Sequence, residues 1–481
     1  MPHRLSGLML MLLLAVVVSA GSAGCAVPPP MQLPESTVEL PPDGFVADRA
    51  RLTGTVDAEW WKGFGDAGLV ELVAAVVAHN PSLMEAAERV EAAAMQAKIA
   101  GASLYPSASL GVTAGRAKSV FGATTTEATS LGVSLSVSWE ADVWGKVRTA
   151  QGAALADWQA AQSDRRAATL SLIAAAAHAW FAAVEARLQR DLAKETVESY
   201  RTTVNVTSQR FDQGVRGALD VRTVRAQLAA AEALLAQREA VVERTVRQLE
   251  ILAGGYPRGE YAVATDLVAL PPPVPVGLPS QLLLRRPDLI SAERQIAAAG
   301  LRVESSRAAM LPSFGLSASA GMAGNHVERL VDPDFFIWNL VGNLLAPLFQ
   351  GNRLRNTVYL NEARARSAAH AFARVALQAF VEVETALAVE SRLADQLAAL
   401  QVAAEEAEAA RRLADDRYAK GLVPLITLLD AQRRELDSRS QLLAVRRARL
   451  DTRIDLHLAL GGGMDELRPD VPPAAGKTET P

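Results

Sequence analysis

An internal duplication constrains this chain of 481 residues more than any other feature. Three landmarks recur at one spacing of 206 residues: Pro81 with Pro287, Pro106 with Pro312, and Gly145 with Gly351. A fourth, at 210–214, returns at 417–421 with a spacing of 207. A fixed offset held by separate landmarks indicates that one structural unit of roughly 200 residues is present twice.

Each copy contains two long stretches that predict helices. Residues 153–213 contain neither glycine nor proline, and residues 352–420 form a run of 69 without either. A helix of that length would extend about 100 Å at 1.5 Å per residue, far beyond an ordinary globular helix. A run of 36 residues follows in each copy, at 218–253 and 425–460, with leucine or valine every seven residues. We therefore predict paired antiparallel helices with coiled-coil packing.

Between the helices, each copy changes to a period of two. Ala108, Leu110 and Val112 alternate with serine, glycine and threonine, which predicts β-strands. We expect one hairpin per copy, at 105–143 and 312–350, with loops around 118–127 and 322–334. A soluble sheet sandwich is one reading. Strands that are apolar on one face and polar on the other also fit an outer-membrane barrel.

Four strands are too few to close a barrel across a membrane. The smallest such barrels have about eight strands, and open sheet edges are not tolerated in lipid. The chain must then oligomerise to span the membrane, with eight strands from two copies or twelve from three.

The N-terminus reads as a secretory signal that ends at the only cysteine. Residues 1–24 hold a short positive start, an apolar run and a small-residue segment, and Cys25 follows directly. This arrangement resembles a bacterial lipoprotein, which predicts that Cys25 is acylated and anchors the mature chain. Ordinary cleavage that leaves a free thiol is the alternative.

Composition argues against several other classes of protein. The net charge of −4 provides no basic field for nucleic acid. One cysteine and six widely separated histidines offer no metal-ligand spacing. Nucleotide-binding and nucleophile motifs are also absent from the sequence. We therefore expect no enzyme activity and no cofactor apart from the lipid on Cys25.

Several motifs resemble one known family. The stretch 273–289, which ends in Arg285-Arg286-Pro287-Asp288-Leu289, looks like the mid-chain signature of the TolC-like outer-membrane efflux proteins. It is most similar to the lipoprotein branch that includes OprM and NodT. Further hallmarks of the first copy resemble the same family, namely Trp60-Trp61 with Phe64 and Asp66, Asn80-Pro81-Ser82-Leu83, and the run 139–148. The resemblance extends from about residue 58 to 462.

This resemblance implies a mixed fold and a channel function. It implies a homotrimer with a twelve-stranded transmembrane β-barrel in the outer membrane and a long α-helical coiled-coil barrel in the periplasm. The trimer would export small molecules such as drugs, receiving them from a periplasmic adaptor protein and an inner-membrane pump of the RND (resistance-nodulation-division) type. A type I protein secretion duct and a non-channel coiled-coil structural lipoprotein are the alternatives.

The resemblance also places a periplasmic gate. Asp430 matches the family's constriction aspartate and Ile426 its apolar ring, while Thr427 stands where some members have a second aspartate. Asp220 matches a residue that helps to hold the tip closed, with Tyr418 as its partner. Three copies of Asp430 around a narrow opening would favour cations.

These readings set the expected boundaries. Before the repeats come the signal peptide 1–24 and a lipidated linker 25–57. Repeat 1 is 58–254, with a first helix, the hairpin 105–143 and helices 149–213 and 218–253. A linker 255–280 leads to repeat 2 at 281–462, with a first helix, the hairpin 312–350 and helices 352–420 and 425–460. A disordered tail, 463–481, ends the chain.

Overall fold

A computed structural model describes residues 44–47, 56–277 and 279–463. Cys25, the signal peptide, most of the N-terminal linker and all but the first residue of the C-terminal tail lie outside the described residues. The chain divides into two compact units. Unit 1 comprises Glu88–Gln162 and Ser291–Arg374, and unit 2 comprises the remaining described residues. Each unit takes matching segments from both copies of the repeat, so the two copies are not separate compact units.

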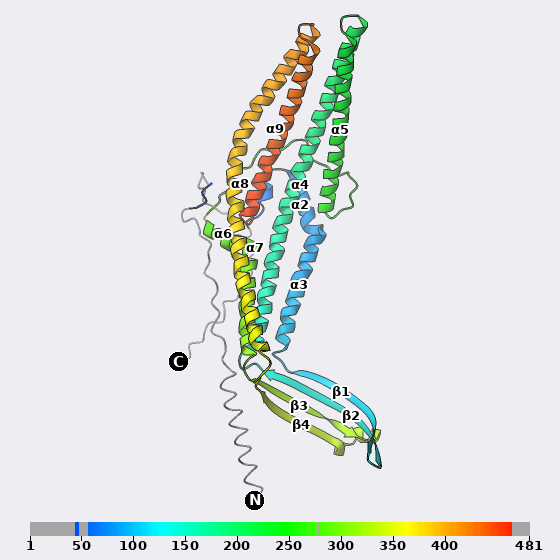
Figure 1. The fold of residues 1–481 in the computed structure, drawn as a ribbon, viewed down its shortest axis with the longest axis vertical. Coiled ribbons are helices and arrows are strands. Elements are labelled where there is room, and N and C mark those ends of the chain that lie inside the picture. The colour runs from blue at the N-terminus through cyan, green and yellow to red at the C-terminus, as the bar shows by residue number, and fades with distance from the viewer. Residues whose placement is uncertain (1–43, 48–55, 278, 464–481) are drawn as a thin grey trace. The chain divides into compact units, whose positions relative to one another are not determined.

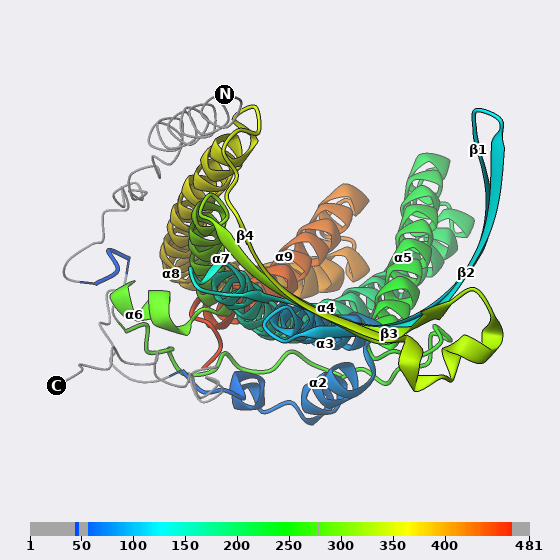
Figure 2. The same cartoon turned by 90° about the horizontal axis from the view of Figure 1, so that it is seen from below.

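Unit 1 contains one four-stranded antiparallel sheet (Figures 1 and 2). Its strands are β1 (Ser107–Phe121), β2 (Thr124–Ala141), β3 (Ser313–Gly324) and β4 (Phe336–Leu345), in the order β1-β2-β3-β4. Strands β2 and β3 come from different copies of the repeat and pair directly, with Val137 opposite Ala318. This pairing explains why the copies merge into one sheet. Strands β1 and β4 are its two edges within the described chain.

The two faces of the sheet differ in chemistry. On one face Leu110 lies opposite Leu135 and Val112 opposite Val133. On the other face serine and glycine dominate, as where Ser109 lies opposite a second serine. Leu110 and Val112 are each 72% exposed. An apolar face this exposed needs a covering that residues 44–47, 56–277 and 279–463 do not provide.

The first hairpin departs from the sequence prediction. The expected loop at 118–127 is strand, because Lys118 lies opposite Glu127 and the ladder continues to Phe121 opposite Thr124. A lysine and a glutamate that face each other across two exposed strands stabilise the strand pair, so these polar residues belong to strands and not to a loop. Only residues 122–123 form the turn, with Gly122 at a φ of 60°. The second hairpin has a longer connection, in which the short helices η2 (Val327–Leu330) and η3 (Pro333–Phe335) lie.

Short helices precede the sheet segments in both copies. In the first copy these are η1 (Trp60–Phe64), α2 (Ala67–His79) and α3 (Pro81–Ala102). In the second copy they are α6 (Pro279–Arg285) and α7 (Pro287–Ala308). Pro81 and Pro287 each stand at the first position of a helix of 22 residues, where the missing N–H is not needed.

Four long helices follow the strands. They are α4 (Lys146–Asp212), α5 (Ala218–Leu252), α8 (Arg353–Ala419) and α9 (Leu425–Ala459). Helix α4 begins three residues before the predicted start at 149, because the carboxylate of Asp142 accepts hydrogen bonds from the backbone N–H groups of Val147 and Arg148. Ion pairs link α4 to α5 and α8 to α9: Arg201 with Glu232 at 3.1 Å, and Arg411 with Glu435 at 2.5 Å.

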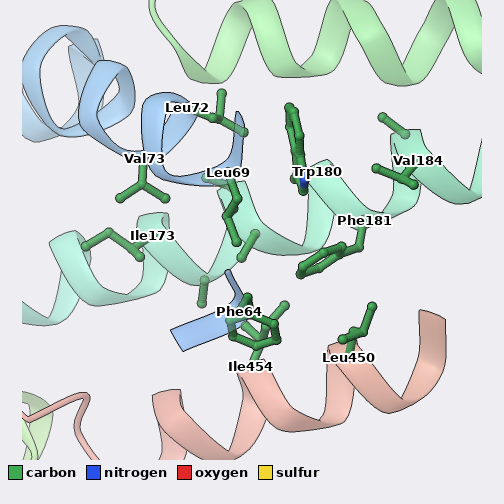
Figure 3. Packing of buried hydrophobic residues seen from close by; sticks show 14 of the residues in the cluster. Phe64, Leu69, Leu72, Val73, Ile173, Trp180, Phe181, Val184, Leu450 and Ile454 are labelled. Atoms are coloured by element: carbon green, nitrogen blue, oxygen red, sulfur yellow. The ribbon is translucent and has the colours of Figure 1, made fainter. Parts of the chain in front are cut away.

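The main core of unit 2 is built around Trp180 (Figure 3). Side chains from η1, α2, α4 and α9 meet there, and Leu69, Phe181 and Ile454 are fully buried. The indole Nε1 of Trp180 donates to Oδ2 of Asp66 at 2.8 Å. The other oxygen of Asp66 caps α2, accepting from two backbone N–H groups. The motif residue Asp66 therefore fixes both the start of α2 and the Trp180 ring.

Helix α4 also has the composition of a membrane helix. An 18-residue window in it has a mean hydropathy of 1.6, and half of that window is buried inside the chain. Ile173, Ala177 and Trp180, at 2%, 0% and 2% exposure, belong to the core just described. Burial in that core accounts for much of the helix's apolar character.

Candidate functional site

The candidate gate lies at the start of α9, after the turn that ends α8. Pro424 stands at the N-cap of α9, and its extended backbone starts the helix at Leu425. On one side Leu425, Leu428 and Leu429 are at most 5% exposed and join a small core. Ile426, in the same turn, points away from this core and is 66% exposed. The helix start is therefore held by three leucines and presents its other face outward.

The carboxylate of Asp430 has two arginine partners on its own helix. Its Oδ1 accepts a hydrogen bond from Nη2 of Arg433 at 2.9 Å, and its Oδ2 accepts from Nε of Arg434 at 2.9 Å. These hydrogen bonds, with that from Arg434 first, hold the pKa of Asp430 below its ordinary value. Helix geometry brings the residues three and four positions on to this carboxylate. Its role as a gate residue stays a prediction.

Tyr418, at the end of α8, contacts the end of α4. Its partner is Thr207 and not the expected Asp220. Its hydroxyl is 2.9 Å from Oγ1 of Thr207, and both groups are buried. Arg210 donates to the carbonyl oxygens of Tyr418 and Ala419, at 2.8 and 2.6 Å, and its guanidinium lies 4.9 Å from the centre of the Tyr418 ring. These contacts join the end of α4 to the end of α8.

Asp220 lies near the same place but is engaged elsewhere. Its carboxylate is 4.0 Å from Nη1 of Arg216, and the Arg216 guanidinium lies 5.8 Å from the centre of the Tyr418 ring. Arg216 thus stands between the two predicted tie residues. The sequence interpretation missed Arg210 and Thr207. Arg210 is the repeat counterpart of Arg417, and that match could have drawn attention to it.

A groove of about 580 Å³ lies behind these contacts, between α4, α8 and α9. Burial raises the pKa of Asp415 and of Glu435, although Arg411 beside them acts in the opposite direction. Gln432 donates to the hydroxyl oxygens of Ser199 and Thr203, at 3.0 and 3.1 Å. Polar side chains of α4 and α9 are therefore joined by hydrogen bonds in the lining of the groove.

The mid-chain signature has a structural role. Arg286 is 8% exposed. Its guanidinium binds both oxygens of Asp288, at 3.0 and 2.7 Å, one oxygen of Glu382 at 2.6 Å, and the carbonyl oxygen of Ala459 at 3.0 Å. A single side chain thus connects the start of α7 with α8 and the end of α9. A planar guanidinium is suited to such a multiple contact.

The pKa values of two histidines in unit 2 are shifted in opposite directions. Burial alone would lower the pKa of His178, but hydrogen bonds to Asp451 and Asp455, each 2.9 Å, outweigh it and raise the pKa to about 9. For His457, burial and then the charge of Arg453 lower the pKa to about 4. The His457 ring stacks on Trp60 with 5.0 Å between centres.

The search for other chemistry covers only residues 44–47, 56–277 and 279–463. Among them no group of three histidine, cysteine or acidic side chains could hold a metal ion. The lipidation residue Cys25 is not among them. The features that remain are the helix tips, the apolar sheet face and the groove.

Comparisons with known proteins agree with this arrangement. The outer membrane efflux protein family matches residues 72–255 and 278–462. The toluene efflux pump outer membrane protein TtgF of Pseudomonas putida is 30% identical over 467 residues, which are 94% of this chain and 97% of TtgF. The pyoverdine export outer membrane protein OpmQ of Pseudomonas aeruginosa is 31% identical over 420 residues, which are 84% of this chain and 87% of OpmQ.

A solved structure supports the same fold. The outer-membrane channel OprN matches with a TM-score of 0.83 at 26% identity, over 92% of this chain and 100% of the OprN chain. The comparison confirms the predicted mixed fold, a long helical coiled-coil barrel with a transmembrane β-barrel in an internally duplicated chain. The chain belongs to the outer membrane efflux protein family, and it is an outer-membrane channel protein of an efflux system.

Proposed function

We propose that three copies of this chain form the exit duct of a tripartite pump that moves small molecules from the periplasm to the exterior. The observation that carries the proposal is the four-stranded sheet of unit 1. It has an exposed apolar face, a face of serine and glycine, and edges at β1 and β4. Three sheets joined edge to edge would give twelve strands with no free edge, which is the closed form that lipid requires.

The helices of unit 2 would continue the duct on the periplasmic side. There, the start of α9 would form the gate, with Ile426 as an apolar ring and Asp430 as the charged one. The contact of Tyr418 with Thr207 supports a closed tip, because it joins the ends of α4 and α8. Arg216, which pairs with Asp220, lies near the same tyrosine ring. Opening would require these contacts to break or shift.

The partners follow from this position. A duct that ends in the periplasm needs a periplasmic adaptor and an inner-membrane pump of the RND type to supply cargo and energy. The names of TtgF and OpmQ, which refer to toluene efflux and pyoverdine export, support small molecules as the cargo class. The chain itself would perform no catalysis and need no cofactor other than the lipid on Cys25, which would anchor it in the outer membrane.

Assembly and export test the proposal together. The full-length chain, purified from outer membranes, should run as a heat-modifiable trimer. When produced with its adaptor and pump in a strain lacking its own ducts, it should restore resistance to toxic compounds.

The variant Leu110→Asp places a charge on the apolar face. It should abolish both the heat-modifiable trimer and the restored resistance. A heat-insensitive monomer that still restores resistance would contradict the proposal. A stable protein in the periplasm with no membrane assembly would favour the non-channel reading.

A further inference from the structure

The exposed side of α9 carries more positive than negative charge where the proposed gate lies. The side chains of Asp430, Arg433 and Arg434 are 38%, 68% and 73% exposed. Ile426, one turn before Asp430 on the same helix, is 66% exposed. One carboxylate and two guanidinium groups give this segment of each chain a net charge of +1.

The contacts of Asp430 strengthen this imbalance. Both carboxylate oxygens already accept a hydrogen bond from an arginine, one from Arg433 and one from Arg434. Each guanidinium uses a single nitrogen for that contact and keeps its other N–H groups available. A passing cation would therefore meet a carboxylate that is shielded, whereas a passing anion would meet donors that are free to bind it.

Arg222 and Arg225 on α5 add positive charge near this segment, whereas Asp437 on α9 acts against them. On α5, Val224 packs into the same small core as the leucines of α9. Arg222 and Arg225, on either side of it in sequence, are exposed and form no ion pair with any described residue. The opposing exposed carboxylate on α9 is Asp437, which lies one turn beyond Arg433. Glu435 is 9% exposed and pairs with Arg411, so its charge is turned inward.

We propose that the periplasmic aperture of the duct is basic and selects anions over cations, so that anionic cargo enters it more readily. The inference rests on the proposed trimeric duct. Three copies would place three carboxylates and six guanidinium groups around one narrow opening, an excess of three positive charges. Fixed charge at a constriction sets ion selectivity, and a narrow low-dielectric opening focuses its field.

Reversal potentials in planar bilayers test the proposal. With the purified full-length protein in asymmetric KCl, the wild type should be anion-selective. The double variant Arg433→Gln with Arg434→Gln removes six charges from the trimer and should change the permeability ratio several-fold toward K⁺. Asp430→Asn removes three negative charges and should move it further toward Cl⁻. Both shifts should shrink at high salt because counterions screen the ring.

Arg392→Gln serves as the matched control. This arginine is also exposed, at 79%, but lies on α8, 25 residues before Arg417, so its loss should leave the reversal potential unchanged. A cation-selective wild type, or an Asp430→Asn variant with lower Cl⁻ preference, would overturn the basic aperture while leaving the duct intact. Failure of the wild type to form any channel would instead overturn the duct and this inference with it.

Discussion

The sheet of unit 1 and the helical core of unit 2 use apolar side chains in opposite ways. In the sheet, Leu110 and Trp338 are both 72% exposed. In the helical core, Leu69 and Phe181 are fully buried. Both regions use leucine and aromatic side chains, so the difference in exposure reflects the surroundings that each region has in the assembled protein. Apolar side chains that point away from a chain's own core indicate another apolar phase or a partner.

This contrast explains how one sequence can serve two environments. The helices bury their apolar side chains against each other, as soluble proteins do. The strands keep theirs on one face, with small polar residues on the other, as barrels in lipid do. Substitutions should therefore have effects that depend on the unit in which they are made.

The largest effect is expected from a matched pair of tryptophans. Trp180→Ala removes a ring that is 2% exposed and the hydrogen bond it donates to Asp66, and should lower the free energy of unfolding by about 3–5 kcal/mol. Trp338→Ala, on the exposed sheet face, should cost roughly 1 kcal/mol or less. Denaturant unfolding followed by circular dichroism measures both. Equal losses would mean that the sheet has a core of its own.

A charge on the sheet should matter next, and only on one face. Leu110→Arg places a cation in the row of apolar side chains and should cost about 2–4 kcal/mol if that row faces lipid. Ser109→Arg, the adjacent residue on the other face, should cost about 1 kcal/mol or less. The fraction of heat-modifiable protein in outer membranes reports the difference. Equal fractions of heat-modifiable protein for Leu110→Arg and Ser109→Arg would contradict the claim that only one face of the sheet contacts lipid.

The two histidines predict a smaller dependence of unit 2 stability on pH. The folded pKa of His178, about 9, is above its ordinary value of 6.5, so its contribution is complete below pH 6.5 and disappears as the pH rises through 9. For His457, with a folded pKa of about 4, stability instead falls as the pH drops below 6.5. Each change should be on the order of 1–3 kcal/mol. His178→Gln should remove the alkaline loss and His457→Phe the acidic one; unchanged profiles would refute these charge states.

The smallest effect on folding is expected at the N-terminus. Cys25→Ser should abolish acyl labelling, while assembly of the sheet should persist because its strands lie elsewhere in the chain. Metabolic labelling with palmitate, alongside the heat-modifiability assay, separates the two outcomes. Unchanged incorporation of palmitate would exclude Cys25 as the lipidated residue.

The elements that the sequence predicted well are those with a long repeating pattern. The absence of glycine and proline over 352–420 indicated α8, and the period of two around Leu110 indicated β1. The strands of the first hairpin were predicted too short, because Lys118 and Glu127 were assigned to the loop, whereas they lie opposite each other in β1 and β2. A charged residue does not distinguish a strand from a loop as long as the residue opposite it on the neighbouring strand is unknown.

The site was predicted less completely than the fold. The segment Asp430 to Arg434 could have been predicted in full, since the spacings of three and four place the arginines beside the carboxylate on a helix. The contact of Tyr418 with Thr207 could not, because 211 residues separate them and only the packed helices bring them together. Resemblance to a family supplied Asp430, while side-chain geometry revealed its partners.

The most direct test of the account is whether β1 is exposed to lipid at every second residue. The chain has a single cysteine, so Cys25→Ser gives a cysteine-free background for single cysteines at positions 108 to 115. In proteoliposomes, fluorophores at the even positions should be quenched by brominated lipid, and cysteines at the odd positions should react with a water-soluble maleimide. Uniform reaction with the maleimide at all eight positions would contradict a membrane-spanning barrel.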